Sequence, residues 1–132
     1  MKPWRESATL IIVSKQLSRN SDNQNLYKTL LLKRVKTARR LPETYVFPGG
    51  VTSNSDFSPK WWHVFEKQGF TKDSLISSIS KRFSGPRPPI INNSLTLSRL
   101  GNPENSLPAD IALRITALRE TFEETGKSKD LL

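Results

Sequence analysis

The chain has 132 residues, of which 35% are hydrophobic and 25% charged, and its formal net charge is +9 at pH 7. This length is sufficient for one domain with a modest core, so we expect a single domain over residues 1–132. The absence of cysteine excludes disulfides and thiolate metal sites, and the single histidine excludes histidine-rich sites. No apolar run reaches the roughly 18–20 residues that span a bilayer, and no signal peptide is visible. The sequence therefore predicts a soluble, intracellular protein without a membrane span.

Three strands are predicted in the first 50 residues. The stretch ATLIIVSK (8–15) is apolar and β-branched enough for a mostly buried strand. The polar residues 17–25 are typical of a hairpin loop, and YKTLLLKR (27–34) is the expected partner strand. The third strand, 44–47, is expected to end at Pro48 and the two glycines that follow.

Basic residues are densest in and after the second predicted strand. They are Lys28, Lys33, Arg34, Lys36, Arg39 and Arg40. Excess positive charge favours an anionic partner, which could be nucleic acid, a phosphate-rich metabolite or an acidic membrane surface. We expect most of these side chains to solvate the surface. Base recognition is not favoured, because no RNA-binding motif with aromatic residues at strand spacing is present.

Helical spacing begins after Gly50. One helix is predicted within residues 58–69, opened by Ser58, and a second within residues 71–83, opened by Thr71. His63 is interpreted as a packing or surface residue. The proline-rich residues 84–94 are predicted to form an extended linker. The apolar residues of both helices are expected to pack in a core rather than to stack on bases: Trp61, Trp62, Phe65, Leu75, Ile76 and Ile79.

The longest helical pattern follows Pro108 and ends at Gly126, a favourable C-cap. Its predicted apolar stripe consists of Ala109, Ala112, Ile115, Leu118 and Phe122. Near its end, Glu120, Glu123 and Glu124 have the i, i+3, i+4 spacing that places them on one face. Repulsion between such carboxylates costs about 0.2–0.5 kcal/mol per pair, so a positive charge is expected opposite them. A divalent cation is a good candidate, because it prefers oxygen ligands and lowers the pKa of bound water.

The motifs FPGG and RETFEETG together resemble the signature of the Nudix hydrolases. This resemblance implies an α/β/α sandwich with a mixed sheet, carrying a helical, proline-rich insertion at 51–107 inside the signature. It also implies that Glu120, Glu123 and Glu124 bind Mg²⁺ or Mn²⁺ bridging a substrate diphosphate. Arg119 would orient the carboxylates within the helix. The implied catalytic residues are Arg119, Glu120 and Glu123, and the implied substrate-binding residues are Arg34, Arg39, Gly49 and Gly50.

The stretch LLLKRVKTARRLPETYVFPGG is similar to the coenzyme A signature of a subset of this family. Arg34 and Arg39 fit it, whereas Val35, Glu43 and Tyr45 replace a small residue, a glycine and a valine. The long insertion is similar to that of acyl-coenzyme A diphosphatases placed in peroxisomes or mitochondria. The resemblance implies a small-molecule substrate of the coenzyme A type, cleaved to adenosine 3′,5′-bisphosphate and (acyl-)4′-phosphopantetheine. The two arginines would then bind the adenosine-side phosphates.

Two positions depart from the Nudix signature. Ile111 replaces its intermediate glutamate, with Asp110 one residue out of register, and Lys127 replaces its final apolar residue. Other family members continue for many residues beyond the signature. We therefore favour a truncated hydrolase, incomplete at the C-terminus, over a shortened fold whose exposed sheet is covered by the insertion.

Three functions are left open at this point. They are a metal-dependent diphosphatase, a catalytically inactive Nudix-like fragment, and a basic nucleic-acid-binding domain. The acyl preference and the oligomeric state are not predicted.

Overall fold

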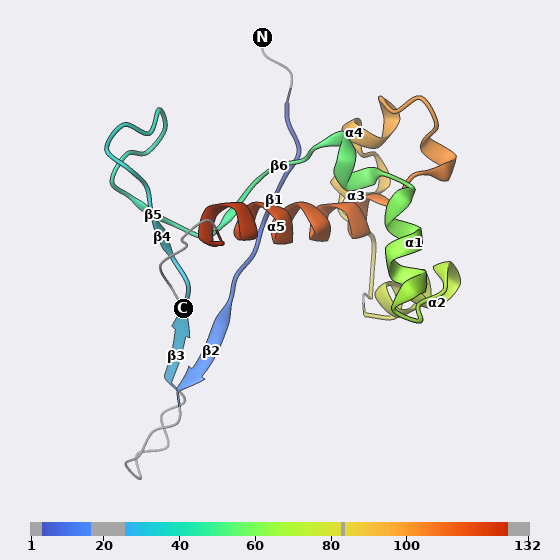
Figure 1. The fold of residues 1–132 in the computed structure, drawn as a ribbon, viewed down its shortest axis with the longest axis horizontal. Coiled ribbons are helices and arrows are strands. Elements are labelled where there is room, and N and C mark those ends of the chain that lie inside the picture. Colours follow the sequence, from blue (N-terminus) through green and yellow to red (C-terminus); the bar gives the residue numbers. More distant parts are fainter. Residues whose placement is uncertain (1–3, 17–25, 83, 127–132) are drawn as a thin grey trace. The chain divides into compact units, whose positions relative to one another are not determined.

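Short strands occupy the N-terminal part of the chain, and helices form most of the remainder (Figure 1). This computed structural model describes residues 4–16, 26–82 and 84–126. The predicted hairpin loop at 17–25 and the signature position Lys127 lie outside the described residues. The chain divides into a first unit, Met1–Ala8 with Val51–Thr116, and a second unit, Thr9–Gly50 with Ala117–Leu132.

The strands pair in twos. β2 pairs with β3 and β4 with β5, both antiparallel, and β1 pairs with β6. The predicted hairpin partnership is confirmed, with Ser14 opposite Lys28 in the β2–β3 register. The strands are β1 (Ser7–Thr9), β2 (Val13–Gln16), β3 (Leu26–Thr29), β4 (Leu32–Lys33), β5 (Tyr45–Val46) and β6 (Gly49–Val51).

The predicted strand boundaries were wrong in three places. Residues 8–15 form two strands separated at 10–12, and residues 27–34 divide at 30–31. Ile11 and Val13 are 58% and 53% exposed, so this segment is not mostly buried. The third strand, β5, does end before Pro48 as predicted, but Gly49 and Gly50 then begin a further strand, β6, which was not predicted. Proline has no backbone N–H to donate, but its carbonyl can still accept. The Pro48 carbonyl accepts a hydrogen bond from Leu10 N at 2.9 Å, so backbone pairing continues at this position.

The predicted helix starts are correct to within about two residues, but the N-cap of α1 is Pro59, without a side-chain cap, and not the predicted Ser58. Thr71 caps α2 by accepting a hydrogen bond from Ser74 N at 3.1 Å, as predicted. The prediction that residues 84–94 form an extended linker was wrong, because they contain α3. Its first residue is Pro89, whose φ angle is already fixed near the helical value. The helices are η1 (Asn54–Phe57), α1 (Lys60–Lys67), α2 (Lys72–Ser80), α3 (Pro89–Asn92), α4 (Leu95–Ser98), η2 (Pro103–Asn105) and α5 (Ala109–Thr125). The mixture of helices and strands confirms the α/β class.

The core of the first unit is built around Phe57, Leu107 and Ala112, each 0% exposed. Ala109 and Ile115 join this core, and the predicted aromatic and aliphatic residues of α1 and α2 pack against it, as expected. Leu118 and Phe122 are instead 60% and 71% exposed, so only the first half of the predicted stripe is buried.

A buried carboxylate ties η1 to α5 within the first unit. Asp56 is 1% exposed. Its Oδ2 accepts hydrogen bonds from Ser53 N at 2.9 Å and from Thr116 Oγ1 at 2.8 Å. These bonds offset the cost of burying the charge and hold the helix beside Phe57.

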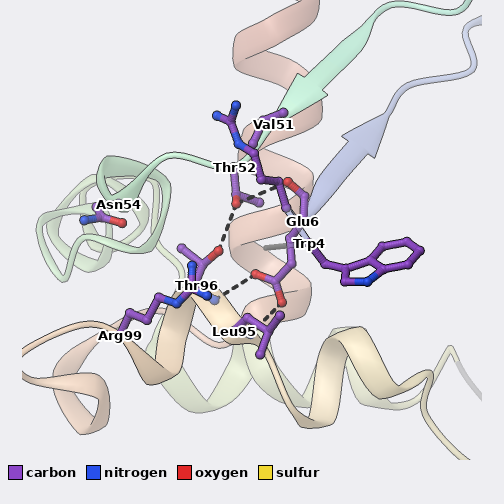
Figure 2. A pocket seen from close by; sticks show the side chains of 9 residues that line it. Trp4, Glu6, Val51, Thr52, Asn54, Leu95, Thr96 and Arg99 are labelled. Carbon is purple, nitrogen blue, oxygen red and sulfur yellow. Dashed lines mark hydrogen bonds between the residues drawn. The ribbon is translucent and has the colours of Figure 1, made fainter. Parts of the chain in front are cut away.

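A second carboxylate fastens the N-terminal segment to α4. Glu6 Oε1 accepts from Leu95 N at 2.7 Å, and Oε2 accepts from Thr96 N and from Ser94 Oγ, both at 3.0 Å. Figure 2 shows this carboxylate directed at the start of the helix. Burial alone raises the pKa of Glu6, but the hydrogen bonds from Thr96, Leu95 and Ser94 outweigh it and hold the pKa below its ordinary value of 4.5.

Glu6→Gln is expected to lower the free energy of unfolding by about 1–3 kcal/mol at pH 7, because one of the two accepting oxygens becomes a donor. Since the pKa is lower in the folded chain, this stabilisation is present above pH 4.5 and is lost as the pH falls through the folded-state value. Thermal unfolding of the parent and of Glu6→Gln between pH 7 and pH 3 measures this pH dependence of the stability difference. The exposed Glu66→Gln is the control. A difference between Glu6→Gln and the parent that does not shrink in acid would contradict this assignment.

Among the residues described, no helix is both long and apolar enough to cross a membrane.

Candidate functional site

Two consecutive glycines of β6 meet the carboxylates of α5 within the second unit. Gly49 N donates a hydrogen bond to Glu124 Oε2 at 3.1 Å. A Cβ at Gly50 would lie 2.3 Å from the carboxyl carbon of Glu120, a distance that real Cβ atoms do not reach. A side chain at position 50 would therefore force the Glu120 carboxylate to move. The Gly49 N–H thus holds Glu124, and Gly50 leaves room for the carboxylate of Glu120.

The positive charge expected opposite the carboxylates is present on the same helix. Arg119 Nη1 lies 2.9 Å from Glu120 Oε1 and 3.5 Å from Glu123 Oε2. The Glu120 pair is largely shielded, with side-chain exposures of 26% for Arg119 and 20% for Glu120, whereas Glu123 is 49% exposed. Arg119 therefore fixes the orientation of one carboxylate firmly and contacts the second at the surface.

The glutamates fit a divalent cation in ligand type. Carboxylate oxygens suit Mg²⁺ and Mn²⁺, and the contacts with Arg119 and with Gly49 each use one oxygen of a carboxylate. Within residues 4–16, 26–82 and 84–126, however, no three histidine, aspartate or glutamate side chains are grouped closely enough to hold a metal ion.

A pocket of about 340 Å³ in the second unit brings a predicted substrate residue beside a predicted metal ligand. Arg34 and Glu124 both line it, although 90 positions separate them in the sequence. Arg34 is held there by its backbone N–H, which donates to Thr44 O at 2.9 Å. Its Nε is buried and has no hydrogen-bond partner in the part of the chain that the structure describes. The complete lining is Leu32, Lys33, Arg34, Val35, Ala38, Val46 and Glu124.

The other basic residues of this region have different positions. Arg39 is exposed and does not line the pocket. Lys33 does line it, although the motif comparison did not select it as a site residue. Its position in β4, one residue before Arg34, is the signal that could have identified it. A pocket with two cationic side chains and a buried, unpaired guanidinium nitrogen is suited to an anionic group.

The loop between β4 and β5 contains a strained position. Glu43 has φ of +56°, in the left-handed region that costs an L-residue about 1–2 kcal/mol. Glu43 is also the position at which the coenzyme A signature has glycine. Its ion pair with Lys36, at 3.9 Å and largely exposed, offsets little of this cost.

Glu43→Gly is therefore expected to raise the free energy of unfolding by about 0.5–1 kcal/mol, since part of the relieved strain is cancelled by the greater freedom of glycine in the unfolded chain. Chemical denaturation of both proteins checks this. Glu43→Ala serves as the matched control, because it removes the same ion pair and retains the strained Cβ. Equal stabilities of the alanine and glycine variants would contradict the explanation.

The intermediate position of the signature is part of the core. Ile111 is 3% exposed and packs with Phe57 and Leu107. Its neighbour Asp110 accepts a hydrogen bond from Arg87 Nη1 at 3.1 Å. Asp110 is therefore engaged in an ion pair that connects the segment before α3 to the start of α5.

A family description, the NUDT19 Nudix domain, matches residues 4–128. The acyl-coenzyme A diphosphatase NUDT19 of Xenopus laevis is 32% identical over 139 aligned positions, covering 96% of this chain and 35% of the relative. The protein of the same name from Gallus gallus is 31% identical, covering 96% and 32%, and that from Homo sapiens is 33% identical, covering 76% and 26%.

The chain thus spans about a third of the length of these relatives. No solved structure matches it significantly. The family match extends over nearly all of the chain, including Gly49 and Gly50, the pocket residues and the glutamates of α5. The expected Nudix resemblance is confirmed: this chain belongs to the Nudix family, in the group described by the NUDT19 Nudix domain.

Proposed function

We propose that this chain carries the diphosphate-cleaving site of a Nudix hydrolase that acts on coenzyme A or acyl-coenzyme A. The products would be adenosine 3′,5′-bisphosphate and (acyl-)4′-phosphopantetheine. The observation that carries the proposal is the pocket that Arg34 and Glu124 line together, in which the buried Nε of Arg34 has no hydrogen-bond partner among the described residues. The names of the relatives, acyl-coenzyme A diphosphatases, support this choice of substrate.

Nudix enzymes generally use divalent metal ions, and we propose Mg²⁺ or Mn²⁺ for this chain. The residues that would hold the ion are Glu120, Glu123 and Glu124. When bound, such an ion neutralises phosphate charge and lowers the pKa of an attacking water.

The protein's own groups have separate tasks in this proposal. Arg119 orients Glu120 through the shielded ion pair, and the Gly49 N–H orients Glu124. Gly50 permits backbone to approach the site closely. Arg34 and Lys33 attract the phosphates on the adenosine side of the substrate, and the exposed Arg39 lies further along the same loop. The peroxisomal or mitochondrial placement stays a prediction.

The direct test is hydrolysis of coenzyme A by the purified chain. We expect turnover with millimolar Mn²⁺ or Mg²⁺ and none with a chelator, and mass spectrometry should identify the two products named above. Dephospho-coenzyme A, which lacks the 3′-phosphate, is the comparison substrate. Absence of metal-dependent cleavage of either compound would reject the proposal for this chain and favour the inactive alternative.

Arg34→Gln is expected to reduce the preference for coenzyme A over dephospho-coenzyme A by about 10–100-fold, the value of one hydrogen bond to a charged group. The kcat/KM ratio of the two substrates measures it. Arg40→Gln removes an equal charge from the same loop outside the pocket, so it should leave the ratio unchanged. An equal loss in both variants would mean that overall charge, rather than Arg34, determines the preference.

A further inference from the structure

A second pocket lies entirely within the first unit and is not used by the proposed reaction. Its volume is about 140 Å³, and it is open beside the Glu6 carboxylate and the start of α4 (Figure 2). The lining residues are Trp4, Arg5, Glu6, Val51, Thr52, Asn54, Leu95, Thr96 and Arg99. The lining is thus rich in side chains that donate hydrogen bonds.

The acceptors of this pocket are already engaged. Both oxygens of Glu6 accept from α4, as described above, and Thr52 N donates to the Glu6 carbonyl at 3.0 Å. The hydroxyl groups of Thr52 and Thr96 lie 3.0 Å apart and bond to each other. The negative charge of the pocket is therefore committed to holding the fold.

The strongest donors are not engaged. The side chains of Arg5, Arg99 and Asn54 are exposed to solvent and make no hydrogen bond or ion pair with any described residue, so they are available to an incoming ligand. Two guanidinium groups against one carboxylate leave the pocket with one excess positive charge. Guanidinium groups pair most strongly with planar carboxylates and with phosphates, through two parallel hydrogen bonds. A volume that holds several water molecules suits a small anion rather than a whole nucleotide.

We propose that this pocket binds a phosphate group, either inorganic phosphate or the phosphate of a small phosphomonoester. Arg5 and Arg99 supply the charge, and Asn54 supplies a neutral donor. Every residue involved belongs to the first unit, whereas the glutamates and Arg34 of the proposed diphosphatase belong to the second. The two proposals can therefore fail independently.

The test is a titration of the full chain with inorganic phosphate, followed by the amide resonances of Thr52, Asn54 and Thr96. Chloride keeps the ionic strength constant, so that screening does not change during the titration. We expect saturable shifts with a dissociation constant in the millimolar range. Arg99→Gln and Arg5→Gln should each weaken binding about tenfold. Arg82→Gln, which removes an exposed arginine of the same unit that does not line the pocket, should not weaken it.

The outcomes are separable. Glycerol 3-phosphate that binds more tightly than inorganic phosphate assigns the pocket to phosphomonoesters, and equal affinity assigns it to the oxyanion itself. The phosphate assignment is overturned if acetate binds as tightly as phosphate, or if the resonance shifts never saturate. It is also overturned if Arg82→Gln weakens binding as much as Arg99→Gln does. Thermal unfolding shows whether each variant is folded. If an arginine variant does not fold, Asn54→Ala takes its place, and we expect it to weaken phosphate binding about threefold. Unchanged coenzyme A hydrolysis in Arg99→Gln is expected throughout.

Discussion

Glu124→Gln is expected to lower metal-dependent turnover of coenzyme A about 10²–10³-fold, the cost of removing one preorganised electrostatic contact from an active site. In the parent chain, Gly49 N donates a hydrogen bond to Glu124 Oε2 at 3.1 Å. Glutamine retains an amide oxygen that can accept this hydrogen bond. The backbone contact should therefore survive while the charge is lost. The measurement is kcat/KM at saturating Mn²⁺, with the melting temperature as the check that the chain remains folded.

The control for this variant is Glu104→Gln, which removes an equal charge from the exposed η2 turn in the first unit. A second measurement is independent of turnover. Millimolar Mn²⁺ should raise the melting temperature of the parent chain, because an ion that binds only the folded state stabilises it. It should raise that of Glu104→Gln equally and that of Glu124→Gln less. Full turnover in Glu124→Gln would remove this residue from the site.

Phe57→Ala is expected to lower the free energy of unfolding by about 3–5 kcal/mol. Phe57 is 0% exposed at the centre of the core of the first unit, and its carbonyl accepts a hydrogen bond from Leu107 N at 2.9 Å. Truncation leaves a cavity between η1 and α5 that the surrounding helices cannot fill completely. This loss is a large part of the roughly 5–15 kcal/mol that stabilises a typical domain.

Urea denaturation of Phe57→Ala and of Phe70→Ala measures this effect against a matched control. Phe70 is 50% exposed, so the same truncation there should cost about 1 kcal/mol or less. Comparable losses at both positions would show that the core is not centred on Phe57.

Among the described residues, local signals in the sequence predicted the three longest helices, α1, α2 and α5, but not the four short ones. Pro108 and Gly126 bracket α5 at Ala109–Thr125, because proline starts a helix favourably and glycine ends it. Thr71 was identified as a cap for the same reason, since its hydroxyl satisfies an N–H only three residues away. Each of these signals acts within one or two turns of helix and needs no knowledge of the remaining fold.

Features that join distant segments could not be predicted in the same way. β6 exists because residues near Gly50 pair with β1, about 40 positions earlier, and no local pattern reports that pairing. The periodicity of Leu118 and Phe122 indicates which face of α5 is apolar but not which residues cover it. The sequence motifs predicted Arg34 as a substrate-binding residue and Glu124 as a metal ligand, without indicating that the two lie together. Their common pocket, and the place of Lys33 in it, required the structure.

The acidic end of α5 has a consequence for the balance between stability and activity. Glu123 and Glu124 stand in the last turn, where the helix macrodipole is negative, and that turn has no basic residue. Each carboxylate there costs about 0.3–1 kcal/mol, and Arg119, one turn earlier, compensates only partly. A sequence optimised for helix stability alone would place lysine at these positions. The helix thus retains an unfavourable charge arrangement that a bound cation would relieve, as is common where an active site and a stable fold make opposite demands.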